Sequence, residues 1–167
     1  MKPKEWIEGL EDDSIWKCYA LIKKELKKRK LIRTGNITGE RGEKLAIKFY
    51  NESSRESNLQ EAPPGTQNVD ALSRKGERYS IKTITLPRKS TGAFYGFNLP
   101  GSKDKEIQKF EYVILVLINE LFEPVKIMEL TWNMFLKHKR WHKTQGAWNL
   151  YLTKNLENDT RLIYGLK

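Results

Sequence analysis

The most constraining feature of this sequence is residues 110–119, FEYVILVLIN, its most hydrophobic run. The run is much shorter than the roughly 20 apolar residues that a helix needs to span a bilayer. Its richness in Val, Ile and Leu is typical of a strand buried at the centre of a sheet. Residues 124–130, PVKIMEL, follow after a short turn and are expected to pair with it. We therefore expect a fold organised around a sheet with 110–119 near its middle.

The other elements follow from periodicity, capping residues and turn signals. These patterns predict helices at 14–31, 38–50 and 131–139, and strands at 68–73, 77–85 and 147–154. The tail from Asn155 is predicted as either a short helix or an edge strand. The order of elements predicts an α/β fold with a mixed sheet flanked by helices, in one domain covering residues 1–167.

The first predicted helix carries both an apolar stripe and much of the positive charge. Its apolar residues recur at three- and four-residue steps, which is typical of a helix face packed on a core: Ile15, Cys18, Tyr19, Ile22 and Leu26. We therefore expect Cys18 to be a core residue. Residues 23–33, KKELKKRKLIR, include seven basic residues and one acid.

The net charge of +10 favours a polyanionic partner, most often nucleic acid, over the alternative of a solvated basic surface. The single cysteine excludes an internal disulfide framework and a Cys-based zinc site. The sequence has no apolar run long enough to cross a membrane, and MKPKEWIEGLEDD lacks the apolar stretch of a signal peptide. We therefore predict a cytoplasmic protein with no membrane partner.

Two long loops are expected, at 51–67 and 86–109, and the second is basic and rich in Gly and aromatic residues. A loop of that length within a compact domain is often functional. Its aromatic residues Phe94, Tyr95 and Phe97 either stack on nucleic-acid bases or cover the core. His138 and His142 have an i, i+4 spacing suited to a metal, but their basic neighbours favour a solvated or phosphate-contacting patch.

The hairpin of residues 68–85 carries the candidate chemistry. If Arg74-Lys75-Gly76 form a three-residue turn, Ser73 pairs with Glu77 and Asp70 faces Ser80. Side chains alternate along a strand, so Asp70, Ser80 and Lys82 then project to one face. A two-residue turn would shift the register and separate Asp70 from Lys82.

An Asp and a Lys on one face suit phosphodiester hydrolysis. Mg²⁺ is held by one or two carboxylates together with waters and substrate oxygens, and it activates an attacking water. A neighbouring lysine orients that water and offsets negative charge. Asp70 is the expected ligand, Lys82 the expected cation, and Glu43 or Glu40 on the second helix a further carboxylate. The competing interpretation of Asp70 and Lys82 is a surface ion pair worth under about 1 kcal/mol.

The segment NVDALSRKGERYSIKT resembles the core motif of the PD-(D/E)xK nuclease superfamily, in which one hairpin strand carries an Asp and the next an acid-x-Lys triplet. The Asp corresponds to Asp70, the triplet to Ser80-Ile81-Lys82, and the family's helix acid to Glu43. The chain is most similar to a group of small bacterial proteins of this class. The matching segments are Arg33-Thr34-Gly35-Asn36, Val69-Asp70-Ala71, Arg78 to Lys82 and Phe110-Glu111-Tyr112.

The resemblance implies a restriction-endonuclease-like, three-layer α/β/α fold and a Mg²⁺- or Mn²⁺-dependent DNA endonuclease of the kind found among type II restriction enzymes. It implies that Asp70, Glu43 and the Ile81 carbonyl hold the metal, with Lys82 as the catalytic cation. Cutting two strands would favour a homodimer. Contacts to DNA are expected from basic and polar residues of the leading helix, the turn after it and the second loop: Lys23, Lys24, Lys27, Lys28, Arg29, Arg33, Asn36, Arg88 and Lys89.

Ser80 departs from the family pattern, because a hydroxyl is a poorer metal ligand than the carboxylate that stands there in the motif. Glu43, Glu40 or Glu77 would have to compensate. The alternative is a non-catalytic nucleic-acid-binding protein of the same fold.

Overall fold

The computed structural model describes residues 2–54, 56–63 and 65–165. In these residues a six-stranded sheet has the order β1-β2-β3-β4-β5-β8, with β3 and β4 parallel and the other neighbours antiparallel. Its strands are β1 (Leu59–Glu61), β2 (Ala71–Ser73), β3 (Arg78–Thr85), β4 (Tyr112–Ile118), β5 (Pro124–Thr131) and β8 (Arg161–Tyr164). A separate two-stranded sheet is formed by β6 (Arg140–His142) and β7 (Ala147–Asn149).

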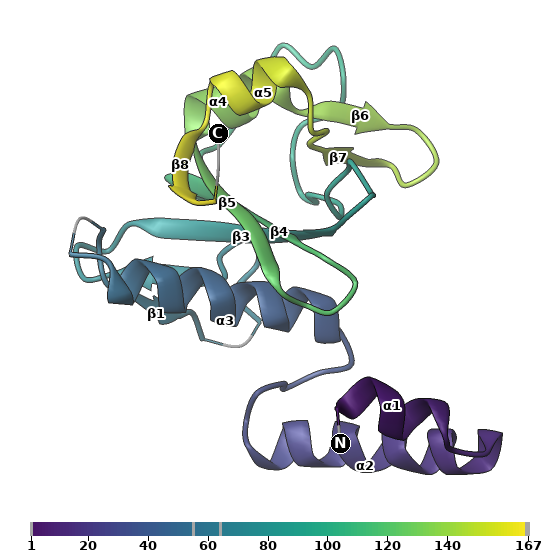
Figure 1. Cartoon of the computed structure of the whole chain (residues 1–167). Coiled ribbons are helices and arrows are strands. Elements are labelled where there is room, and N and C mark those ends of the chain that lie inside the picture. The colour runs from purple at the N-terminus through teal and green to yellow at the C-terminus, as the bar shows by residue number, and fades with distance from the viewer. Residues whose placement is uncertain (1, 55, 64, 166–167) are drawn as a thin grey trace.

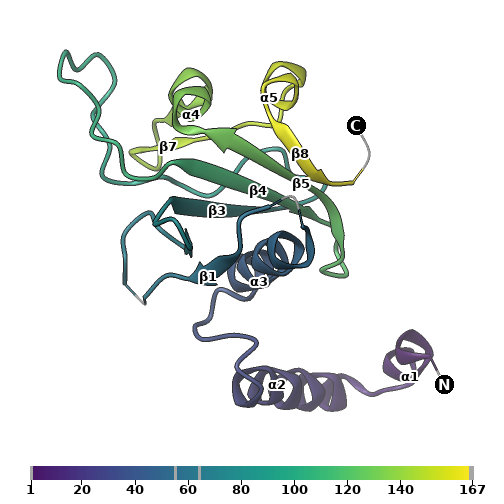
Figure 2. The ribbon, with the colours of Figure 1, turned by 90° about the vertical axis from the view of Figure 1, so that its left-hand side faces the viewer.

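The described residues form five helices: α1 (Pro3–Glu8), α2 (Asp12–Lys28), α3 (Ile37–Glu52), α4 (Trp132–His138) and α5 (Lys154–Asn158). Figure 2 shows α3 on one face of the large sheet and α4 and α5 on the other. The predicted α/β class, with a mixed sheet flanked by helices, is confirmed.

Strand β4 organises the core, as its hydrophobicity predicted, because its residues 113–118 are all buried. Its alternating side chains supply two core clusters. Ile114 and Val116 pack with Leu45 and Tyr50 of α3, whereas Leu115 belongs to the cluster on the other face. That second cluster includes Phe135 of α4, Leu156 of α5 and the loop residue Phe94, and the partly buried Phe97 packs against it. For Phe94, which is fully buried, core packing is therefore the correct alternative.

Several short elements differ from the sequence prediction. Strand β1 lies within the predicted loop 51–67, whose residues Arg55 and Pro64 are outside the described part of the chain. Helix α1 and strand β6 were not predicted, and the predicted strand 147–154 ends at Asn149. The tail contains both alternatives, helix α5 and strand β8 on the edge of the sheet. Short elements carry too few periodic positions for their sequence to identify them.

The predicted core packing of the first helix is wrong. No residue of α2 is buried, and Cys18 is only partly covered. Figures 1 and 2 show the reason: α3 lies between the large sheet and α2, so α2 does not reach the sheet. The linker between α2 and α3, residues 29–36, is attached to α3. Its Ile32 is buried, and Glu40 of α3 accepts from the backbone N–H groups of Arg33 and Thr34. The stripe of α2 is therefore left without cover from the sheet.

None of the helices in the described ranges has the length and apolar character that crossing a membrane requires.

Candidate functional site

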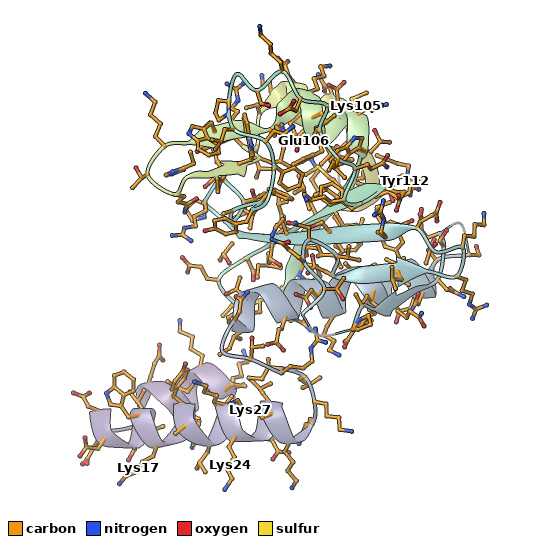
Figure 3. All side chains as sticks on the ribbon, turned by 180° about the vertical axis from the view of Figure 1, so that it is seen from behind. Lys17, Lys24, Lys27, Lys105, Glu106 and Tyr112 are labelled. Atoms are coloured by element: carbon orange, nitrogen blue, oxygen red, sulfur yellow. The ribbon has the colours of Figure 1, made fainter. Side chains whose placement is uncertain are left out.

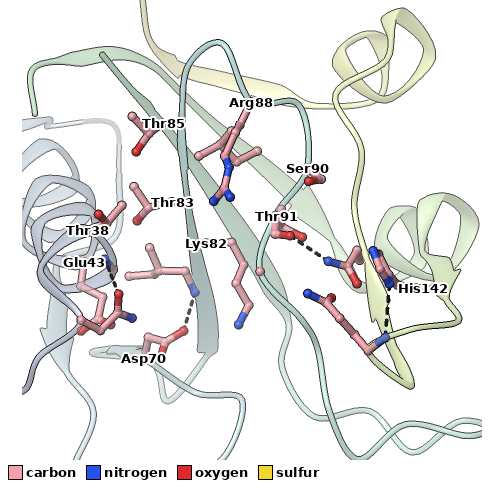
Figure 4. A pocket seen from close by; sticks show the side chains of 17 residues that line it. Thr38, Glu43, Asp70, Lys82, Thr83, Thr85, Arg88, Ser90, Thr91 and His142 are labelled. Carbon is pink, nitrogen blue, oxygen red and sulfur yellow. Dashed lines mark hydrogen bonds between the residues drawn. The ribbon is translucent and has the colours of Figure 1, made fainter. Parts of the chain in front are cut away.

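A polar cleft of about 670 Å³ lies along an open edge of β3. The β2–β3 ladder pairs Ala71 with Tyr79 and goes no further, whereas β3 continues to Thr85. Residues 81–85 of β3 therefore pair with β4 on one side and face the cleft on the other. Figure 4 shows Glu43 and Asp70 on one side of this cleft and Thr91 and His142 across from them, with Lys82 between.

The hairpin has the predicted three-residue turn. Ser73 N–H donates to the Glu77 carbonyl at 2.9 Å, and Gly76 has a φ of +82°, which favours glycine. The pairing of Leu72 with Arg78 agrees with the expected register. Past the ladder, Asp70 N–H still donates to the Tyr79 carbonyl at 2.8 Å, so the backbone of Asp70 remains attached to β3.

The carboxylate of Asp70 is held in place from β3. Its Oδ2 accepts from the Ile81 backbone N–H at 2.6 Å and from the Ser80 hydroxyl at 3.4 Å. Ser80 is fully buried, and its hydroxyl, which donates to Asp70, therefore helps to orient the Asp70 carboxylate. Asp70 and Lys82 both line the cleft, and because the cleft runs along the edge of β3, Ile81 and Thr83 of the opposite alternation line it as well, whereas Ser80 does not.

Glu43 reaches the same cleft from α3 because the helix lies very close to β3. A Cβ at Gly42 would overlap the side chain of Thr83, so a glycine is required at this approach. Glu43 Oε2 accepts from Arg33 Nη2 at 3.2 Å. One cleft is thus lined by two carboxylates, Glu43 from α3 and Asp70 just before β2, and by the ammonium of Lys82 on β3.

The electrostatics of these three groups are unusual. Burial and the neighbouring charge of Asp70 raise the pKa of Glu43 to about 7, although Arg33 acts in the opposite direction. Burial lowers the pKa of Lys82, against the opposing influence of Asp70 and Glu43. Lys82 Nζ lies 4.7 Å from the centre of the Phe94 ring, a cation–π distance. A bound cation would reduce the repulsion between two like-charged carboxylates in a partly buried cleft.

The main chain of β3 adds an oxygen to this group. The N–H and C=O of one strand residue point to the same side. Since the Ile81 N–H is directed to Asp70, the Ile81 carbonyl also faces the open edge. Within the described ranges no cluster of three or more His, Cys, Asp or Glu side chains could hold a metal. Two carboxylates and a carbonyl are nevertheless hard oxygen donors, and Mg²⁺ keeps its remaining positions for waters and substrate.

The other acids considered from the sequence have different partners. The Glu40 carboxylate binds the linker, where it accepts from the Arg33 and Thr34 N–H groups and from the Thr34 hydroxyl at 2.5 Å. Glu77 accepts from the Ser73 hydroxyl at 2.8 Å inside the hairpin. Among the described residues, neither belongs to the set that lines the cleft.

The far wall of the cleft contains residues that the sequence analysis did not assign to the site. His142 and Gln145 come from the β6–β7 hairpin, and Gln145 N–H donates to His142 Nδ1 at 3.3 Å. Asn149 Nδ2 donates to the Thr91 carbonyl at 2.8 Å, whereas Asn149 Oδ1 is buried without a hydrogen-bond partner. The two histidines do not share a site, because His138 Nε2 lies 2.7 Å from Asp159 Oδ2.

The residues predicted to contact DNA do not gather in one place. Arg88 and Asn36 line the cleft, and Asn36 Oδ1 also caps α3 by accepting from Gly39 N–H at 3.1 Å. Lys89 is exposed and borders a different hollow, beside Leu86 and Leu152. The basic residues of α2 do not line the cleft, because α2 lies apart from the sheet, as Figure 3 shows for Lys17, Lys24 and Lys27.

No protein-family model matches this chain. A search of curated proteins also finds no significant match.

Proposed function

We propose that this protein is a metal-dependent DNA endonuclease with a restriction-endonuclease-like fold. The observation that carries the proposal is the meeting of Glu43, Asp70 and Lys82 in one polar cleft at the open edge of β3. The resemblance of residues 68–83 to the PD-(D/E)xK motif supplies the reaction class, and the net charge of +10 supports a polyanionic substrate.

Asp70 and Glu43, with the Ile81 carbonyl, would hold a Mg²⁺ or Mn²⁺ ion in this cleft. When bound, the ion polarises the phosphate and lowers the pKa of an attacking water. Ser80 orients Asp70 through its hydroxyl and is a positioning residue in this scheme. The raised pKa of Glu43 reflects burial and repulsion by Asp70, a situation that a divalent cation reverses.

Lys82 is the proposed catalytic cation. Its ammonium orients the attacking water and offsets the negative charge that develops on the phosphate oxygens. In the reaction the water oxygen would form a bond to phosphorus and lose a proton to solvent, while the bridging P–O bond breaks and its electron pair stays on the sugar oxygen, which takes a proton from solvent. The Phe94 ring, 4.7 Å from Lys82 Nζ, provides a cation–π contact to this ammonium.

DNA would enter between the two walls of the cleft. Arg88 and His142 on the far wall are suited to phosphate contacts, and the exposed lysines of α2 add a basic surface at the N-terminus. Sequence-independent phosphate contacts of this kind weaken steeply as salt is added.

A non-catalytic nucleic-acid-binding protein is the second candidate, and Ser80 is the observation that favours it. The position that carries an acid in the motif is here a buried hydroxyl, so among the described residues the cleft has two carboxylates, Glu43 and Asp70.

Cleavage of supercoiled plasmid in Mg²⁺ or Mn²⁺ tests the proposal. Wild-type protein should nick and linearise the plasmid, EDTA should stop the reaction, and Asp70→Asn and Lys82→Met should each abolish it. Asp104→Asn and Lys103→Met, in the exposed loop, are matched controls that should cut normally. Salt-sensitive binding without cleavage, unchanged by Lys82→Met, would establish the binding protein instead.

A further inference from the structure

The N-terminal helices expose an apolar surface that the rest of the described chain does not cover. Seven large apolar side chains of α1 and α2 are exposed, and Trp16 is 71% exposed: Trp6, Ile7, Ile15, Trp16, Tyr19, Leu21 and Ile22. Monomeric proteins seldom expose apolar patches of this kind unless the patch binds something. The central stripe of α2 is therefore a candidate interface.

Helix α2 is also charged oppositely at its two ends. Its start, residues 11–13, consists of Glu11, Asp12 and Asp13, all exposed. Its end, residues 27–30, consists of Lys27, Lys28, Arg29 and Lys30, also exposed. The helix therefore has an acidic end, a basic end and an apolar stripe between them.

We propose that the apolar face of α2 binds the α2 helix of a second copy of this chain, with the two helices antiparallel. A two-fold axis between Ala20 and Leu21 would bring Ile15 beside Leu26 of the other copy, and Tyr19 beside Ile22. Each acidic end would then lie beside the basic end of the other helix, which is the charge complementarity expected at a specific interface. A parallel pair would place like charges together.

A second copy fits this surface better than nucleic acid does. The exposed stripe is apolar and offers no contact to phosphate, whereas Lys17 and Lys24 lie on the opposite side of α2 and stay free for a polyanion (Figure 3). The interface is also independent of the cleft, since no α2 residue lines it. The dimer is therefore expected whether or not the protein cuts DNA.

Sedimentation equilibrium of the full-length protein without DNA is the first test. We expect a particle of twice the 19.6 kDa chain mass in the micromolar range. Tyr19→Glu with Ile22→Glu should give a monomer, because each charge would be buried in the interface. Its melting temperature, extrapolated to low protein concentration, should match that of wild type, since α2 has no buried residue. Lys17→Glu, on the other side of the helix, is the matched control and should remain a dimer.

Charge reversal tests the orientation. Glu11→Lys with Asp12→Lys should weaken the dimer at least tenfold in low salt, because basic ends would then meet. Adding Arg29→Glu and Lys30→Glu to the same chain should restore it, since residues 29 and 30 lie beside residues 12 and 11 of the other copy in this antiparallel register.

Three results would overturn this inference. A wild-type monomer at 100-fold above the micromolar range would exclude a functional dimer. An assembly unaffected by Tyr19→Glu with Ile22→Glu would place the interface elsewhere. Failure of the fourfold reversal to restore association, with the helix intact by circular dichroism, would exclude the antiparallel arrangement.

Discussion

Two groups of acids in this protein, one buried and one half-buried, differ in how their charges are compensated. Glu129 on β5 is 6% exposed and accepts at both oxygens, from the Tyr50 hydroxyl at 2.6 Å and from Arg161 at 3.0 Å. Arg161 is in turn bound by Glu56 at 2.7 Å. In the cleft, Glu43 Oε2 accepts from Arg33 Nη2 at 3.2 Å, but burial and the neighbouring negative charge of Asp70 raise the pKa of Glu43.

The difference separates a group that stabilises the fold from one that we propose as a ligand site. A buried carboxylate with a partner at each oxygen is typical of a structural network, and removing a partner destabilises the protein. A carboxylate whose pKa is raised by burial and by a like-charged neighbour lowers stability, as Glu43 does beside Asp70, and such groups are typical of functional sites. The same contrast holds on one helix, because Glu40 has a lowered pKa from the hydrogen bonds of Arg33 and Thr34, whereas Glu43 has a raised one.

The largest expected effect is on catalysis at the cleft. Lys82→Met should lower kcat for plasmid cleavage by about 10²–10³-fold, the loss typical of removing one group that stabilises transition-state charge. Single-turnover kinetics with saturating protein measure this. Because burial disfavours the charged form of Lys82 and lowers its pKa, the variant should be at least as stable as wild type. A variant that is inactive because it is unfolded would show no cooperative melting transition and would not support the assignment.

Glu129→Gln should have the opposite profile. Losing the charge that pairs with Arg161 should lower the free energy of unfolding by about 2–4 kcal/mol, because the network is buried around Glu129. Urea denaturation at neutral pH measures the change. Activity per folded molecule should be unchanged, since Glu129 does not line the cleft. Glu25→Gln removes an exposed helix ion pair and is the control, with little expected change.

Removing the charge of Glu43 should stabilise the metal-free protein. Its pKa is about 7 in the folded state against a usual value of 4.5, so the folded state holds this proton more tightly than the unfolded state does. The resulting loss of stability is absent below pH 4.5 and complete above pH 7. In EDTA at pH 8, Glu43→Gln should therefore raise the free energy of unfolding by about 1–3 kcal/mol. The gain should disappear near pH 4.5, and a destabilised variant at pH 8 would contradict this account.

The sequence was sufficient for the parts of the site that depend on local pattern. The run 110–119 identified β4 because a strand buried on both faces must be apolar throughout. The glycine of the hairpin turn determined the turn length and register that place Asp70 beside the Ser80–Lys82 segment.

The remaining parts depend on contacts between distant segments. His142, Gln145 and Asn149 reach the cleft only because the β6–β7 hairpin packs beside the loop after β3, and nothing in their local sequence records that. The apolar stripe at residues 15–26 correctly predicted a helix but not what this helix packs against, because periodicity identifies an apolar face without identifying what covers it.

The smallest expected effect is the stabilisation of the folded protein by a divalent cation. A ligand that binds only the folded state at ten times its Kd stabilises by about 1.4 kcal/mol, and Mg²⁺ at millimolar concentration should raise the melting temperature accordingly. Glu43→Gln and Asp70→Asn should each remove the shift, because each deletes a proposed ligand. Glu129→Gln should retain it, since its carboxylate is already engaged by Tyr50 and Arg161. An equal shift in all three variants would mean that the cation binds elsewhere, and the contrast between the two acidic groups would then have to be explained without a metal.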